Sequence, residues 1–218
     1  MKNKRYILTA IDAFTGYPFL YPLENATAPA IANKLSKAFA TFGYPQIIVS
    51  DLGMNFLSVV LKNLFNIYNI QHRKTSSRHP CCNGQIERMH APMHAALRKL
   101  TESHPSRWCE YITAVTFALR CSPSQKTLMT PIFAVTGRNV RSPIDMTIPD
   151  ELIRTTEVSR ESLEKFISDF ETVREIQMDN IERAQQRNLI QHGKRSISRK
   201  FNKGEYVYYY VPVQKIQI

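Results

Sequence analysis

Strand-like and helix-like patterns alternate along residues 5–137, and this order constrains the fold more than any other feature. Residues 5–12 have a strand pattern, and residues 19–21 continue as the hairpin partner after a turn in which Gly16 can take positive φ. Helical spacing at residues 27–42 and 56–68 flanks a short apolar run at 47–49, and residues 70–74 suit a further strand. Helices are then predicted at 83–101, 106–120 and 131–137. This order predicts an α/β domain with a mixed sheet, in which residues 47–49 are buried on both faces.

Three acidic residues lie at the ends of these predicted elements. Asp12 closes the first strand, Asp51 closes the apolar run, and Glu87 lies just inside the helix predicted from residue 83. Carboxylates from two strand ends and one helix can converge on hard divalent cations, which prefer oxygen ligands. Two such cations about 3.5–4 Å apart can stabilise the attacking and leaving oxygens of a phosphoryl transfer. Any one of these acids alone is better explained as a solvated residue at an element end. The set with its flanking residues is harder to explain in that way.

The charge balance indicates a polyanionic partner. The chain has 29 Lys and Arg against 18 Asp and Glu, a formal net charge of +11. Such an excess favours nucleic acid first and an anionic membrane surface second. No apolar stretch approaches the roughly 18 residues that a membrane span needs, and residues 1–5 run into a strand pattern without the apolar core of a signal peptide. Membrane-spanning and secreted proteins are therefore excluded.

The four cysteines do not suggest a metal site. Cys81 and Cys82 are adjacent, whereas Cys109 and Cys121 are isolated on helical patterns. No C-x₂-C pair is present, so the spacing of a structural zinc site is absent. We expect reduced thiols in an intracellular protein and no zinc in this chain.

The composition changes after about residue 150, and we divide the chain into 1–150, 151–200 and 201–218. A long amphipathic helix is predicted over about 158–189, and it can pair with another helix or pack on its own domain. The stretch 183–204 is basic and has no acid, so it binds phosphate or remains a solvated tail. Residues 204–211 alternate like a strand. A lone strand is not a domain, so 201–218 is interpreted as the start of an incomplete module.

These residues resemble the integrases of retroviruses and, more closely, of Ty3/Gypsy-type LTR retrotransposons. Ile11–Thr15 resembles the first catalytic strand, Ser50–Phe56 matches S-D-x-G-x-x-F, and His79–Arg88 matches H-P-x-x-N-G-x-x-E-R. The 35 residues between Asp51 and Glu87 meet the D-D-35-E spacing. Trp108–Arg138 resembles the end of the catalytic domain, and Ile181–Val207 resembles the linker and first strand of the C-terminal SH3-like barrel.

The resemblance implies an RNase H-like fold with a five-stranded mixed sheet flanked by helices, followed by a long linker helix and the first strand of a truncated barrel. It implies metal-dependent 3′-end processing and strand transfer of retroelement DNA into target DNA. By motif match, Asp12, Asp51 and Glu87 would be the catalytic residues and would hold two Mg²⁺ or Mn²⁺ ions. It also implies action in the nucleus after a cytoplasmic pre-integration stage, as a homodimer or higher multimer.

The resemblance and the local charge together give a set of DNA-binding candidates. Asn83 and Gly84 match the mobile loop of the family that lies against the DNA end, where glycine permits a close backbone approach. Basic residues surround the third motif and follow the long helix, and either group suits a phosphate backbone. The basic residues chosen are Arg78, Arg88, Arg98, Lys99, Lys194, Arg195, Arg199 and Lys200.

Several positions depart from the pattern of the family. The His-His-Cys-Cys zinc module that normally precedes the catalytic domain is not found in the eleven residues before Asp12. Pro92 stands where the family has a continuous helix, and a proline inside a helix costs about 3 kcal/mol. Leu52 replaces a polar residue, Ala91 and His94 replace common lysines, and Arg120-Cys121 replaces a frequent Tyr-Asn pair.

Three functions therefore remain open. The first is an integrase that cuts and joins DNA. The second is a domesticated or degenerate DNA-binding or interaction protein without turnover, which Pro92 and the missing ends favour. The third, a nuclease on the same fold, is weakened by the long linker and the barrel-like strand.

Overall fold

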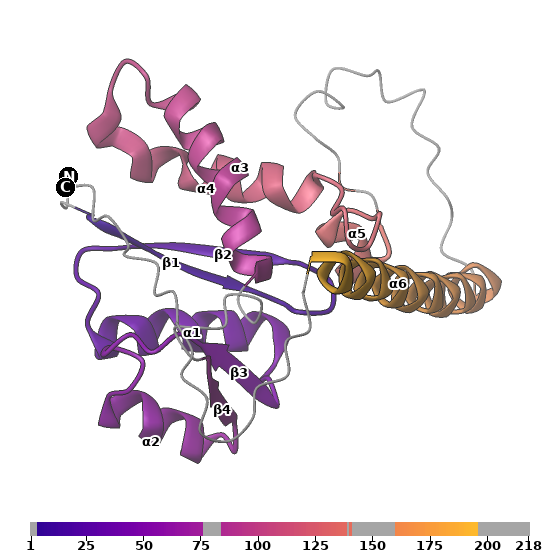
Figure 1. Cartoon of the computed structure of the whole chain (residues 1–218), viewed down its shortest axis with the longest axis horizontal. Helices are drawn as coiled ribbons and strands as arrows, with labels where there is room; N and C mark the ends of the chain where they lie inside the picture. Colours follow the sequence, from indigo (N-terminus) through magenta and orange to yellow (C-terminus); the bar gives the residue numbers. More distant parts are fainter. Residues whose placement is uncertain (1–3, 76–83, 139, 141–159, 196–218) are drawn as a thin grey trace. The chain divides into compact units, whose positions relative to one another are not determined.

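The computed structural model describes residues 4–75, 84–138, 140 and 160–195 of the 218-residue chain (Figure 1). Its strands are β1 (Tyr6–Ile11), β2 (Pro18–Leu23), β3 (Ile47–Ser50) and β4 (Gln71–Lys74). Its α-helices are α1 (Ala28–Phe42), α2 (Val59–Ile67), α3 (Gly84–Leu100), α4 (Trp108–Cys121), α5 (Pro131–Thr136) and α6 (Arg160–Arg195). The predicted α/β class is confirmed. None of the helices in the described ranges is long and apolar enough to cross a membrane.

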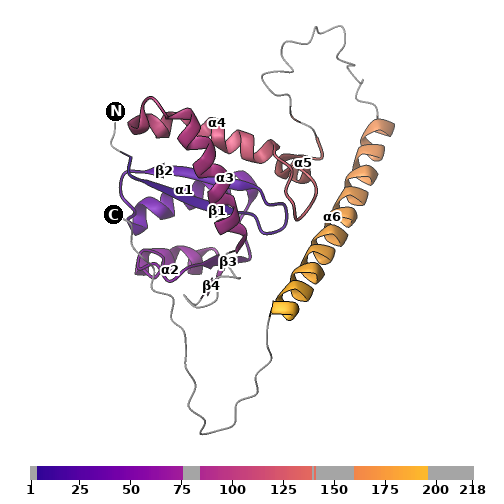
Figure 2. The same ribbon diagram turned by 45° about the horizontal axis from the view of Figure 1, so that its top comes forward.

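The β1–β2 hairpin is antiparallel and buries side chains on both faces. Leu8 pairs with Tyr21, and Thr9 pairs with Leu20. Because successive side chains alternate between the faces of a strand, Leu8 enters a core with α1 while Leu20 enters a second core with α3 and α4. The two views place α1 on one side of the hairpin and α3 and α4 on the other (Figures 1 and 2). Gly16 makes the turn with φ +73°, as predicted.

The strands β3 and β4 form a separate parallel sheet. Ile48 pairs with His72, and among the described residues neither strand is hydrogen-bonded to the hairpin. The five-stranded mixed sheet is therefore not confirmed. The expectation that residues 47–49 are buried on both faces is wrong, because Ile47 and Val49 are 41% and 45% exposed while only Ile48 packs on the core.

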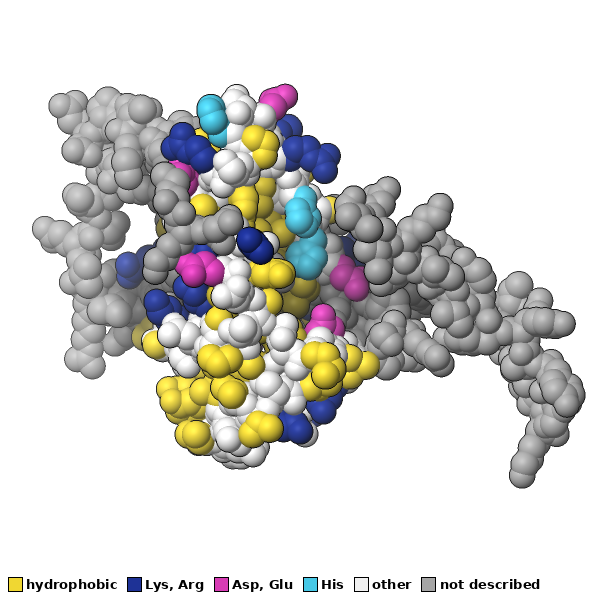
Figure 3. All heavy atoms as spheres, turned by 90° about the vertical axis from the view of Figure 1, so that its left-hand side faces the viewer, with side chains coloured by type: hydrophobic (Ala, Val, Ile, Leu, Met, Phe, Trp, Pro, Cys, Tyr) yellow, Lys and Arg dark blue, Asp and Glu magenta, His cyan; other side chains and the backbone are white. Residues whose placement is uncertain are grey.

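The first core joins both sheets through α1 and α2. Ile31, Leu35 and Phe39 of α1 lie at helical spacing and pack with Leu61 and Phe65 of α2. The helix α2 begins after Ser58, whose hydroxyl accepts a 3.4 Å hydrogen bond from Leu61 N. On the outside of this part of the molecule, hydrophobic side chains are visible over the lower half of Figure 3. The exposed hydrophobic residues on α2 and in the segment before it include Met54, Val59, Val60 and Ile67.

The second core places α3 across the hairpin. Met89, Met93 and Leu97 of α3 pack with Ile112 and Val115 of α4 and with the hairpin. The helix α3 continues through Pro92, which is exposed, while Met89 and Met93 on either side of it in sequence stay buried. Proline lacks the N–H that would bond the carbonyl four residues earlier, so the carbonyl of residue 88 loses its helical donor while the apolar stripe is kept.

The helix α6 is 36 residues long and covers the predicted linker helix. The chain divides into two compact units, Met1–Ile181 and Glu182–Ile218, so the division falls within α6. Gln177 and Ile181 are buried in the first unit. The predicted domain boundary at residue 150 and the predicted strand at 204–211 lie outside the described residues.

Leu128 provides a stability prediction. Its φ is +58°, a left-handed conformation that strains any side chain with a Cβ, and it is 65% exposed. We expect Leu128→Gly to raise the free energy of unfolding by about 1 kcal/mol, measured as a higher denaturant midpoint at unchanged m-value. Leu128→Ala keeps the Cβ and its strain and is the control. Equal midpoints for the two variants would contradict the prediction.

Candidate functional site

Asp12 lies at the first residue after β1 and is held by its own turn. Its Oδ2 accepts hydrogen bonds from Thr15 N at 2.7 Å and Thr15 Oγ1 at 2.6 Å. Its backbone N donates to Tyr17 O, and its carbonyl accepts from Gly16 N. The side chain of Asp12 is exposed and its Oδ1 accepts no hydrogen bond from a described residue. The turn therefore orients one carboxylate oxygen and leaves the other available to a ligand.

Side chains from distant parts of the chain hold this turn in place. Arg120 donates two hydrogen bonds to Pro18 O, at 3.2 and 3.3 Å, and its guanidinium lies 4.3 Å from the ring centre of Tyr17. The pKa of Tyr17 is raised by burial, with the charge of Arg120 acting in the opposite direction. Gln177, which is fully buried, donates to Phe14 O at 2.9 Å. In the sequence, Arg120 stood out only because Arg120-Cys121 replaces the Tyr-Asn pair that is frequent in the family. In the structure it supports the Asp12 turn.

Asp51 lies at the end of β3 beside a histidine. Ser50 precedes it, and the Ser50 hydroxyl lies 2.8 Å from His72 Nε2 of β4. Burial lowers the pKa of His72, and the neighbouring charge of Lys74 lowers it further. The Oδ1 of Asp51 accepts a 3.1 Å hydrogen bond from Gly53 N. A Cβ at Gly53 would lie only 3.0 Å from this oxygen, which explains the glycine of the S-D-x-G-x-x-F motif.

Glu87 lies near the start of α3, which crosses the hairpin. His90 Nε2 is 3.1 Å from Thr9 Oγ1 of β1, and a Cβ at Gly16 would lie 3.6 Å from Gln85 Nε2. Burial and the nearby His94 lower the pKa of His90, and Glu87 acts in the opposite direction. The start of α3 is thus packed on the turn that carries Asp12, and the Glu87 side chain is exposed.

Two of the three acidic positions lie on elements in direct contact, and the third lies on the other sheet. Glu87 and Asp12 come from elements in direct contact, whereas Asp51 belongs to the sheet that is not hydrogen-bonded to the hairpin. Among the described residues no group of three His, Cys, Asp or Glu side chains is close enough to hold a metal ion. The chemistry of these exposed carboxylates fits a hard divalent cation. Their arrangement in this structure does not yet form a site for one.

The proposed DNA-binding residues fall into described and undescribed groups. Gly84, Arg88, Arg98 and Lys99 lie on α3, and the three basic side chains are exposed. A Cβ at Gly84 would meet only the Arg88 guanidinium, at 3.6 Å, an ordinary contact, so packing within the protein does not require this glycine. Lys194 and Arg195 lie in the last turn of α6, and nothing is described of their side chains. Arg78, Asn83, Arg199 and Lys200 lie outside the described residues.

A family comparison finds a match for the first part of the chain. Residues 1–80 match the sequence model of the integrase core domain. The matched range contains Asp12 and Asp51 with the motifs around them, and it ends before Glu87.

The curated relatives are viral polyproteins. The Gag-Pol polyprotein of feline leukemia virus is 32% identical over 125 residues, which cover 56% of this chain and 7% of the relative. The Pro-Pol polyprotein of feline foamy virus is 29% identical over 165 residues, which cover 73% of this chain and 14% of that protein. The chain therefore spans between 7% and 14% of the length of these two relatives.

A solved structure shares the fold. The catalytic core domain of HTLV-2 integrase, in complex with magnesium in a trimeric form, aligns with a TM-score of 0.50 and 20% identity. The alignment covers 58% of this chain and 81% of that domain. The described α/β domain thus shares its fold with that catalytic core domain.

Proposed function

We propose a function from the premise that the chain carries a retroviral-type integrase core, which its sequence match, viral relatives and fold support. The proposed activity is that of an integrase-type polynucleotidyl transferase. It would process the 3′ ends of retroelement DNA and transfer them into target DNA. The observation that carries this proposal is the position of Asp12 and Asp51, at the ends of β1 and β3 within the matched range.

Asp12, Asp51 and Glu87 are the residues proposed to hold two Mg²⁺ or Mn²⁺ ions. The chemistry that such a pair supplies is activation of the attacking oxygen and stabilisation of the leaving 3′-oxygen. The protein contributes orientation, because Thr15 fixes one oxygen of Asp12 and Gly53 fixes one oxygen of Asp51. The active arrangement would bring all three carboxylates together, whereas no group of three forms among the described residues of this structure.

The proposed partners are DNA and further copies of the chain. The formal charge of +11 favours a polyanion, and exposed Arg88, Arg98 and Lys99 extend along the helix that carries Glu87. The HTLV-2 core domain has been solved in dimeric and trimeric forms, and this supports a homodimer or higher multimer here. Because the proposed action is on target DNA, the proposed location of the protein is the nucleus, after a cytoplasmic stage. The finer assignment to the Ty3/Gypsy type remains a prediction.

The alternative is a DNA-binding protein of the same descent without turnover. Two observations favour it: no group of three metal-binding side chains forms among the described residues, and Pro92 interrupts the hydrogen bonds of the helix that carries Glu87. The exposed basic residues of α3 would bind DNA in this protein without any metal.

A cleavage and joining assay tests the proposal. The full chain is incubated with duplex oligonucleotides and a branched strand-transfer product, in Mg²⁺, in Mn²⁺ or in chelator. We expect metal-dependent nicking or reversal of joining, reduced to the chelator background in Glu87→Gln, which loses the charge but keeps the shape of the side chain. Equal DNA binding by both proteins without cleavage of either substrate would instead support the alternative.

A further inference from the structure

Lys126 lies in the short loop between α4 and α5. Ser124 N donates to Met129 O at 3.0 Å, and Leu128 N donates to Ser124 O at 2.8 Å. Lys126 N donates to Ser124 Oγ at 3.2 Å, and Thr127 is almost completely buried. The backbone that carries Lys126 is therefore fixed by hydrogen bonds on both sides.

The side chain of Lys126 reaches the turn that carries Asp12. Its Nζ donates a 3.2 Å hydrogen bond to the carbonyl of Ala13, the residue after Asp12. A lysine ammonium has three donors, and this is its one hydrogen bond to a described residue. Two donors thus remain near the turn that carries Asp12, for a ligand with acceptor oxygens.

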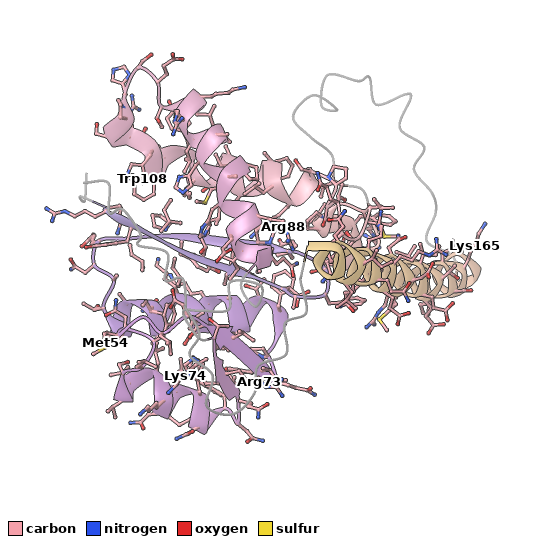
Figure 4. All side chains as sticks on the ribbon, viewed as in Figure 1. Met54, Arg73, Lys74, Arg88, Trp108 and Lys165 are labelled. Carbon is pink, nitrogen blue, oxygen red and sulfur yellow. The ribbon has the colours of Figure 1, made fainter. Side chains whose placement is uncertain are left out.

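Arg88 is a second cation near this turn, because the start of α3 packs on it: a Cβ at Gly16 would lie 3.6 Å from Gln85 Nε2. It follows Glu87 near the start of α3, where Figure 4 labels it. Burial lowers the pKa of Lys126, the charge of Arg88 lowers it further, and Asp12 acts in the opposite direction. The ion pairs among the described residues, Lys4–Glu24 and Arg107–Glu110, include neither cation.

Two like charges held near each other are unfavourable unless an anion joins them. Asp12 offers one negative charge to two cations, and the proposed function would share that charge with metal ions. An additional anion would therefore be stabilised by both cations. A DNA phosphate is a suitable anion, since phosphate accepts several hydrogen bonds and is met well by Lys and Arg together.

We propose that Lys126 and Arg88 form a phosphate-binding pair, which takes a phosphodiester of the DNA backbone directly beside Asp12. This inference rests on the proposed function and adds Lys126 as a substrate-contacting residue. The competing explanation is that Lys126 only tethers the Ala13 carbonyl and so stabilises the turn.

Salt-dependent DNA binding separates the two explanations. Binding of the full chain to a 20-base-pair duplex of arbitrary sequence is measured in chelator at several salt concentrations. The variants are Lys126→Gln, which loses the charge but keeps an N–H donor, and Lys126→Arg, which keeps both. Lys62→Gln removes an exposed lysine of α2 and is the matched control.

The phosphate contact predicts a specific change of slope. Each phosphate contact contributes about −0.9 to the slope of log K against log salt. We expect Lys126→Gln to reduce the magnitude of the slope by about one and Lys126→Arg to restore it. Combining Lys126→Gln with Arg88→Gln should reduce the magnitude by about two. Lys62→Gln should leave it unchanged.

Two results would overturn the proposal. They are an unchanged slope in Lys126→Gln, whether or not its melting temperature falls, and an equal loss of slope in Lys62→Gln. If Lys126→Gln does not fold, Arg88→Gln alone is decisive, since Arg88 is exposed and its slope must still fall by about one. Because the assay contains no metal, its failure is distinct from a failure of cleavage.

Discussion

Replacing Asp12 by asparagine is expected to lower the metal-dependent activity of the full chain by about 10³-fold while leaving its fold intact. The variant loses one negative charge from the proposed metal site, and a loss of about 4 kcal/mol of transition-state stabilisation corresponds to this factor. Asparagine keeps an oxygen that can accept the hydrogen bonds of Thr15 N and Oγ1. The turn should therefore remain, and the free energy of unfolding should change by less than about 1 kcal/mol.

The measurement is the initial rate of nicking in Mn²⁺, together with a denaturation curve for each protein. Glu102→Gln is the matched control, because it removes an exposed carboxylate just after α3 at a position with no proposed role. Equal rates for Asp12→Asn and Glu102→Gln would remove Asp12 from the site. A large loss of stability in Asp12→Asn would show that the carboxylate mainly supports the turn.

Replacing Phe65 by alanine is expected to lower the free energy of unfolding by about 3–5 kcal/mol. Phe65 is 2% exposed and lies in the core that joins α1 and α2 to both sheets. Its ring centre lies 5.0 Å from that of His72, the residue beside Ser50. The substitution removes buried apolar area and leaves a cavity that the neighbouring helices can fill only in part.

The same helix provides the control. Ile67 is 75% exposed, and Ile67→Ala should change the free energy of unfolding by less than about 0.5 kcal/mol. Chemical denaturation of the two variants and the wild type measures the difference. Similar costs at positions 65 and 67 would mean that the first core does not carry the stability of this part of the chain.

The elements that depend on local sequence were predictable. The alternation in residues 5–12 and 19–21, with Gly16 between them, predicted the hairpin and its turn. The helical stripes of α1 and α2 were likewise visible, since every third or fourth residue is apolar. Asp12, Asp51 and Glu87 were placed correctly at element ends for the same reason. Local patterns indicate which face of an element is apolar. That information was sufficient to locate these elements and the acidic residues at or near their ends.

The relations between elements were less predictable. Ile47 and Val49 have the residue types of a strand buried on both faces, yet what covers them depends on which strands pair, and that is not a local property. Lys126 belongs to no motif that the sequence shows. Its proposed role depends on its hydrogen bond to Ala13, which lies far away in the chain. Arg120 was noticed only as an unusual residue, and its contacts with Pro18 and Tyr17 again join distant segments.

The outer face of β3 matters for anyone who prepares this protein. Ile47 and Val49 are exposed hydrophobic side chains on this strand. The second edge of the strand has no neighbour among the described residues. Such an edge readily recruits strands of other molecules. We therefore expect concentrated solutions of the protein to aggregate and become turbid. Val49→Lys should reduce the turbidity, because it places a hydrated charge on the exposed side of the strand.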